Sequence, residues 1–259
     1  MGKTAIAMVA PTDREAEFIN KLPKITAAFW VMKIAATTLG ETAGDWASMT
    51  LDLGYQLATQ IFFAIFVVSL AAQLLSRRHI PFLYWAVIIA TSTAGTTMSD
   101  YMDRSLELGY TRGATILVTI LLVTLALWRM TTGSLSVTNV KDRRGEVFYW
   151  MAILVSNTLG TASGDFLSED SGLGFIGSWL LVAGMLALVL GLTYFTQLSR
   201  VFLFWLAFIL TRPFGATFGD VLTKPQATGG LDLGRGWSSL VLLVILVVAI
   251  AISYRKTRP

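Results

Sequence analysis

A motif of one tryptophan, one glycine, one small residue and one aspartate occurs four times along the chain with constant spacing. It reads W-x9-G-x3-[GS]-D, and its copies begin at Trp30, Trp85, Trp150 and Trp205. A second pattern follows each aspartate, as DLGY at Asp52, ELGY at Glu107, GLGF at Gly172 and DLGR at Asp232. Self-similarity at a fixed period is typical of stacked supersecondary units. The chain is therefore predicted to contain four copies of one unit.

Each unit carries two apolar stretches. The eight stretches lie at 25–44, 55–75, 81–99, 113–130, 147–164, 174–194, 201–219 and 237–254. Most approach the roughly 20 residues that a helix needs to cross about 30 Å of hydrocarbon. Only 14% of the residues are charged, against about 25% in soluble domains. We predict an all-α polytopic membrane protein with eight transmembrane helices in four parallel two-helix repeats, because two crossings return each repeat to the same side.

The basic residues predict the topology and the domain limits. The chain ends and the connections between repeats hold 14 of the 20 lysines and arginines, whereas 11 of the 16 acidic residues lie toward the opposite face. By the positive-inside rule both termini are cytoplasmic. The predicted segments are an N-terminal stretch at 1–24, repeats at 25–80, 81–130, 146–199 and 200–254, a cytoplasmic linker at 131–145 and a tail at 255–259.

Several classes of function are disfavoured by what the sequence lacks. There is no cysteine, so disulfides and thiolate metal sites are excluded. No H-E-x-x-H or G-x-S-x-G motif occurs, so we expect neither an enzyme nor a bound cofactor. No Walker-type loop is present to drive transport with ATP. No cleavable signal is evident, and we expect no nucleic-acid partner.

The motif has a structural interpretation in close helix packing. Its small residues stand four apart on one helix face, where they let backbones approach closely in lipid; they are Gly40 and Gly44, Gly95 and Ser99, Gly160 and Gly164, and Gly215 and Gly219. On this interpretation the tryptophans form the cytoplasmic aromatic belt, and each aspartate caps the following turn at the opposite interface.

The motif also has a functional interpretation. Polar residues at membrane depth usually face a bundle interior or a water-filled path. The candidates for a cation or proton path are Asp45, Asp100, Asp165, Asp220, Glu41, Thr42, Thr97 and Asn157. Because ionised oxygen ligands suit hard cations such as Mg²⁺, Ca²⁺ or Mn²⁺, the four aspartates are also a candidate metal site.

Two basic residues interrupt the predicted spans and break the symmetry of the repeats. Lys33 stands where the other copies have isoleucine or phenylalanine, and Arg212 lies immediately before Pro213. A charge inside a span is costly and by default functional. Both are candidates for an internal ion pair, although Lys33 is also placed to snorkel to the cytoplasmic interface. The expected partners of Arg212 are Asp220, Glu41 or an aspartate of a neighbouring unit.

Residues 25 to 254 resemble a family of bacterial "membrane-anchored" proteins, on the strength of the four early tryptophans and the G-x3-[GS]-D endings. That family is defined by such a repeat of unknown function. The resemblance implies a bacterial inner-membrane protein with eight spans, and it implies no catalytic or binding residue.

We expect a secondary transporter, namely a cation or metal-ion/proton antiporter or exporter that uses the motif aspartates. The alternatives are a pseudo-tetrameric cation channel and a non-transporting membrane scaffold or accessory protein. The expected partners are the lipid bilayer and a transported cation or proton. The exposed glycine faces also permit a homodimer, which no residue decides.

Overall fold

The computed structural model describes residues 23, 25–76, 79–135, 137, 140 and 143–257. The predicted N-terminal stretch at 1–24 lies outside the described residues except for residue 23. The same holds for part of the predicted linker at 131–145 and for the last two residues of the tail.

Within these residues the structure is all-α, as predicted, and contains no strand. Its long helices are α2 (Ala27–Asp45), α3 (Gly54–Leu75), α4 (Pro81–Asp100), α5 (Tyr110–Thr132), α6 (Arg143–Asp165), α7 (Gly174–Phe195), α8 (Arg200–Thr223) and α9 (Arg235–Thr257). Five helices of the described chain are long and apolar enough to cross a membrane, namely α3, α5, α7, α8 and α9. The protein is therefore a membrane-type helical protein with internal repeats.

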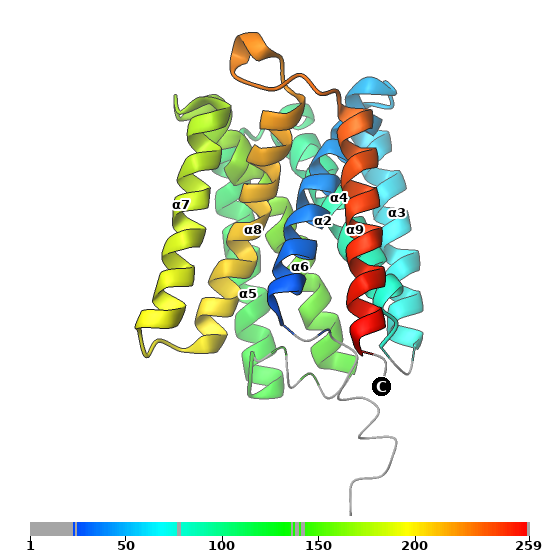
Figure 1. Ribbon diagram of the computed structural model, residues 1–259, viewed down its shortest axis with the longest axis vertical. Coiled ribbons are helices and arrows are strands. Elements are labelled where there is room, and N and C mark those ends of the chain that lie inside the picture. The colour runs from blue at the N-terminus through cyan, green and yellow to red at the C-terminus, as the bar shows by residue number, and fades with distance from the viewer. Residues whose placement is uncertain are drawn as a thin grey trace, which may run out of the picture.

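The first helix of each repeat belongs to a closed inner ring. Helix α2 packs on α4, α4 on α6, α6 on α8, and α8 returns to α2. The second helices stand outside this ring (Figure 1). Each covers the inner helix of the next repeat: α3 packs on α4, α5 on α6, α7 on α8, and α9 on α2. The repeats therefore interlock in a cycle, and α2 begins at the same end of the molecule at which α9 ends (Figure 1).

The two rings differ in what they bury. In α3 only Ala58, Phe66 and Gln73 are buried, whereas α2 buries most of its length, including its threonines and Glu41. The outer helices consequently expose leucine, valine, isoleucine and phenylalanine side chains, which is stable only in apolar surroundings. The inner helices α2, α4 and α6 are less apolar because their polar side chains face one another inside the protein.

The connections from inner to outer helix end in the same backbone conformation, which explains the second sequence pattern. A π-helical turn follows the motif aspartate in three repeats, at Trp46–Thr50, Tyr101–Ser105 and Phe166–Asp170. The chain then adopts positive φ twice, at the first residue of the DLGY-type pattern and at its glycine. The four glycines have φ between 66° and 76° and are Gly54, Gly109, Gly174 and Gly234. Glycine is favoured there because it has no Cβ to clash.

Two expectations about the motif are wrong. Asp45, Asp100 and Asp165 make no side-chain capping bond to the turn that follows them. The tryptophans do not form a lipid-facing belt, because Trp85, Trp150 and Trp205 are 2%, 0% and 5% exposed, and only Trp30 is half-buried. The belt interpretation failed because the indoles pack inside the bundle, against aromatic rings of the inner helices such as Tyr84 and Tyr149.

Candidate functional site

The motif glycines lie where neighbouring inner helices come closest. A Cβ on Gly40 would lie 2.5 Å from Ser92 Cβ, one on Gly160 would lie 2.5 Å from Arg212 Cβ, and one on Gly95 would lie 3.0 Å from Asn157 Cβ. The cycle closes between the last and first repeats, where a Cβ on Gly215 would lie 2.5 Å from Thr37 Oγ1. Each glycine thus faces the seventh residue after the tryptophan of the next repeat.

The second small residue of the motif repeats this arrangement one turn later. A Cβ on Gly44 would lie 3.1 Å from Thr96 Cβ, one on Gly164 would lie 3.0 Å from Ala216 Cβ, and one on Gly219 would lie 3.1 Å from Glu41 Cβ. The partner is now the eleventh residue after the next tryptophan. Ser99, which replaces glycine in the second repeat, donates to Asp103 Oδ2 at 3.2 Å.

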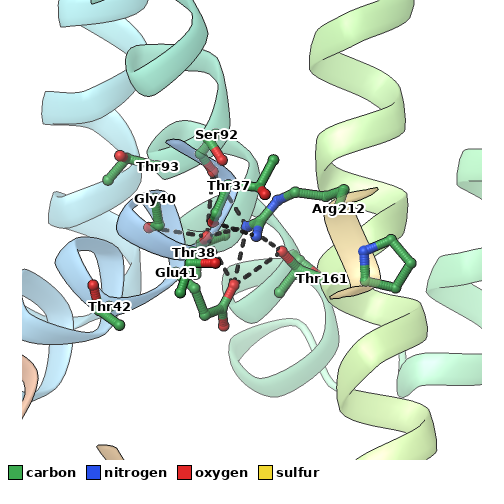
Figure 2. Close-up of polar contacts among 12 residues, drawn as sticks. Thr37, Thr38, Gly40, Glu41, Thr42, Ser92, Thr93, Thr161 and Arg212 are labelled. Atoms are coloured by element: carbon green, nitrogen blue, oxygen red, sulfur yellow. Dashed lines mark hydrogen bonds and ion pairs between the residues drawn. The ribbon is translucent and has the colours of Figure 1, made fainter. Parts of the chain in front are cut away.

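These two levels of the ring meet at Arg212, whose side chain is wholly buried. Its guanidinium contacts all three other repeats (Figure 2). The Nη2 atom lies 3.0 Å from Glu41 Oε2, donates to Thr161 Oγ1 at 2.6 Å and to the Ser92 carbonyl at 3.3 Å, and also donates to Thr96 Oγ1. The Nη1 atom donates to the Thr37 carbonyl at 3.1 Å.

Glu41 is the only acidic member of this cluster and is also buried. Besides the guanidinium, its Oε2 atom accepts hydrogen bonds from Thr96 Oγ1 at 3.2 Å and from Thr161 Oγ1 at 3.5 Å. A buried charge is tolerated when it is paired and hydrogen-bonded. Of the three partners expected for Arg212, the structure therefore selects Glu41.

The prediction that Lys33 snorkels to the cytoplasmic interface is wrong, because its side chain does not reach the surface of the protein. Its side chain is wholly buried, its Nζ atom has no hydrogen-bond partner among the residues that the structure describes, and this atom lies 4.1 Å from the centre of the Phe208 ring. The equivalent residues Ile88, Ile153 and Phe208 are wholly buried as well. Lys33 therefore makes a cation–π contact rather than the expected ion pair.

The four motif aspartates end or approach the end of their inner helices and are almost wholly buried. Three cations from the adjoining turns and helix ends form ion pairs with them. The pairs are Arg104 Nε with Asp100 at 3.1 Å, Arg104 Nη2 with Asp165 at 3.7 Å, Lys224 Nζ with Asp220 at 3.3 Å, and Arg235 Nε with Asp45 at 3.5 Å. Sequence reasoning overlooked these cations, although the spacing of four residues in Asp100/Arg104 and Asp220/Lys224 was a visible signal.

The aspartates are not arranged as a metal centre. In the part of the chain that the structure describes, no group of three or more His, Cys, Asp or Glu side chains could hold a metal ion. The acidic end is instead a network of ion pairs that carries more carboxylates than cations.

The remaining candidates for a path form their hydrogen bonds with groups other than Arg212. Thr42 Oγ1 accepts a hydrogen bond from Ser239 of α9 at 2.8 Å. Thr97 donates to the carbonyl of Thr93 in its own helix at 3.3 Å. Asn157 donates to Thr91 Oγ1 at 3.1 Å and links α6 to α4. Thr42 and Asn157 thus link neighbouring helices, and the methyl group of Thr97 lies 3.5 Å from where a Cβ on Gly44 of α2 would stand.

A further contact ties the second repeat to the third at the acidic end. Tyr110 donates to Glu169 Oε2 at 2.6 Å, and Arg104 Nη2 lies 2.9 Å from Glu169 Oε1. Partial burial raises the pKa of Glu169, but the hydrogen bond from Tyr110 and the charge of Arg104 outweigh it, so this pKa lies below its usual value.

The repeat geometry agrees with a comparison of the sequence with known families. A family model described as Repeat of Unknown Function (DUF347) matches four times, at residues 28–79, 83–134, 148–199 and 203–259. The chain belongs to this family. Each DUF347 repeat supplies one inner helix and one outer helix, and each motif tryptophan falls close to the start of its match. No curated protein and no solved structure matches the chain, so the family assigns the repeat and leaves the function open.

Proposed function

We propose that this protein is a secondary membrane transporter that exchanges a cation for protons, with Glu41 and Arg212 as its coupling element. One observation carries the proposal, namely a buried ion pair at the centre of a closed ring to which all four repeats contribute. Ionisable groups at membrane depth are costly and mark ion pathways and proton relays.

The proposal places all eight long helices across the membrane. The three that are less apolar, α2, α4 and α6, belong to the inner ring and are enclosed by their neighbours. The basic residues of the connections orient the beginning of α2 and the end of α9 toward the cytoplasm. The membrane is then the bacterial inner membrane, and the acidic end faces outward.

The charges suggest a sequence of events for a cation. Four motif aspartates and Glu169 outnumber Arg104, Lys224 and Arg235 at the acidic end, which raises the local concentration of cations there. Four residues before Asp45 on the same helix, Glu41 forms an ion pair with the Arg212 guanidinium. A proton or cation that binds Glu41 displaces this guanidinium, and competition between the two for one carboxylate couples their movements.

The closed ring also resembles a pseudo-tetrameric channel, the second candidate. Against an open cation pore stands the guanidinium of Arg212, whose positive charge lies where the four inner helices meet. On the transporter hypothesis this group moves during each cycle, whereas on the channel hypothesis it must leave the axis permanently when the pore opens.

The test is a flux assay on purified protein in liposomes that contain a pH-sensitive dye. Divalent and monovalent cations are added outside one at a time. The test variant is Asp45→Asn with Asp165→Asn, and the matched control is Asp52→Asn with Asp232→Asn, because these last two aspartates are exposed and asparagine tolerates their positive φ. Cation-driven proton movement in wild type and control, lost in the test variant, supports the exchanger.

Absence of proton movement with every cation contradicts the exchanger. Ohmic currents in a planar bilayer then support the channel. Absence of any flux or current leaves the scaffold or accessory protein.

A further inference from the structure

A cavity of about 630 Å³ lies away from the axis, between the outer helix α7 and the inner helices α8 and α2. Its wall is mostly apolar and includes Ile34, Leu190 and Phe204. On α7, Leu190 and Tyr194 stay 59% and 76% exposed, so the cavity opens on the outer surface of the bundle. Its volume falls in the range of small-molecule sites.

The second and third repeats differ in the side chain at the position of this cavity. In the second repeat Trp128 of α5 packs on Tyr149 and Trp205, with ring centres 6.4 and 5.6 Å apart, and fills the space between α6 and α8. The equivalent residue of the third repeat is Thr193, because both stand 18 positions after the last residue of the second pattern.

A threonine therefore stands in the third repeat where the second repeat has an indole, and the equivalents in the first and fourth repeats are Gln73 and Ser253. The equivalents of Tyr149 and Trp205 there are Phe204 and Trp30, and both line the cavity together with Thr193. Trp30 is also the one motif tryptophan that is not buried. The cavity thus lies at the position that the Trp128 side chain fills in the second repeat.

One end of the cavity is basic. Arg200, the first residue of α8, contributes to the lining, is exposed, and donates through Nη1 to the carbonyl of Thr193. A guanidinium has five N–H donors, so the others remain for an anion in a bidentate contact. An apolar cavity with an arginine at its mouth matches a molecule with an apolar tail and an anionic head.

We propose that this cavity is a binding site for an anionic phospholipid, with one acyl chain against Trp30 and Phe204 and the headgroup phosphate at Arg200. The basic connections place this end of α8 at the cytoplasmic face, where basic pockets between membrane helices bind anionic headgroups. The site is separate from the Glu41 and Arg212 pair and does not depend on the transport proposal.

The test uses phosphatidylglycerol with brominated acyl chains, titrated into phosphatidylcholine nanodiscs that hold the purified protein. Bromine quenches nearby tryptophan fluorescence, and comparison with Trp30→Phe isolates the signal of Trp30. We expect saturable quenching of Trp30 in the wild type. Thr193→Phe, which fills the cavity, should abolish the saturable part, whereas the control Leu188→Phe on the exposed face of α7 should leave it unchanged.

Arg200→Gln should raise the phosphatidylglycerol content at half-saturation about fivefold without removing the cavity. This variant provides the test if Thr193→Phe does not fold. Brominated phosphatidylcholine should quench Trp30 only weakly, and free glycerol phosphate should not relieve the quenching. The proposal is overturned if Thr193→Phe is quenched like the wild type. It is also overturned if both headgroups quench equally, or if glycerol phosphate competes.

Discussion

Removal of Arg212 while Glu41 remains should strongly destabilise the protein. The substitution Arg212→Met keeps most of the side-chain volume but removes donors to five oxygen atoms, and Glu41 then keeps only the hydroxyls of Thr96 and Thr161. Breaking a buried pair in this way costs about 3–5 kcal/mol. Glu41→Gln should cost less, because Arg212 retains the two threonine hydroxyls and two backbone carbonyls as acceptors.

The double variant distinguishes this reasoning from simple loss of contacts. With both charges removed no uncompensated ion stays buried, so Glu41→Gln combined with Arg212→Met should be more stable than Arg212→Met alone. The free energy of unfolding is measured by denaturant titration in detergent micelles, with tryptophan fluorescence as the signal. If the double variant loses the sum of the two single losses, the pair is not energetically coupled and the account of the cluster fails.

Three further predictions concern stability and use thermal unfolding in detergent. Gly215→Ala should cost about 1–3 kcal/mol, because its Cβ would lie 2.5 Å from a hydroxyl of α2, whereas the control Gly184→Ala, which meets nothing within 4 Å, should cost nothing; equal losses would contradict the packing argument. Lys33→Ile should raise stability by about 1–3 kcal/mol, because it removes a buried Nζ that has no hydrogen bond among the described residues, and a loss would show that the cation–π contact with Phe208 outweighs the cost of burying the ammonium. Tyr110→Phe should destabilise the protein at neutral pH but progressively less below about pH 4. The reason is that Glu169 has a lower pKa in the folded state than in the unfolded one, so the stabilisation it provides is present above the unfolded-state pKa and is lost as pH falls through the folded-state pKa. A difference in stability between variant and wild type that persists unchanged to about pH 3 would refute this.

Much of the fold was predictable because the repeat contains residues, such as its glycines, that only a few local geometries explain. The glycine at each helix contact, the alternation of polar and apolar spans and the internal charge of Arg212 are local features of the sequence. The interlocking of outer and inner helices was not predictable, since it depends on the path of the connections, including positive φ at residues such as Asp52 and Glu107, which composition does not reveal.

The candidate site was predictable in part for a similar reason. Glu41 was one of three possible partners for Arg212, and only the closure of α8 on α2 decides among them. The ion pair between Arg235 and Asp45 joins residues far apart in the sequence, so no sequence spacing indicates it. The tryptophans were misplaced because an interfacial position along a helix does not determine whether its side chain faces lipid or a neighbouring helix.

The most direct test of the central claim is proton flux through Glu41→Gln protein in liposomes, compared with wild type under an imposed cation gradient. Circular dichroism and size-exclusion profiles establish first that the variant is folded and inserted. The account predicts cation-driven proton movement in the wild type and none in Glu41→Gln, because the carboxylate for which proton, cation and Arg212 compete is gone. Coupled flux at the wild-type rate in Glu41→Gln would contradict it.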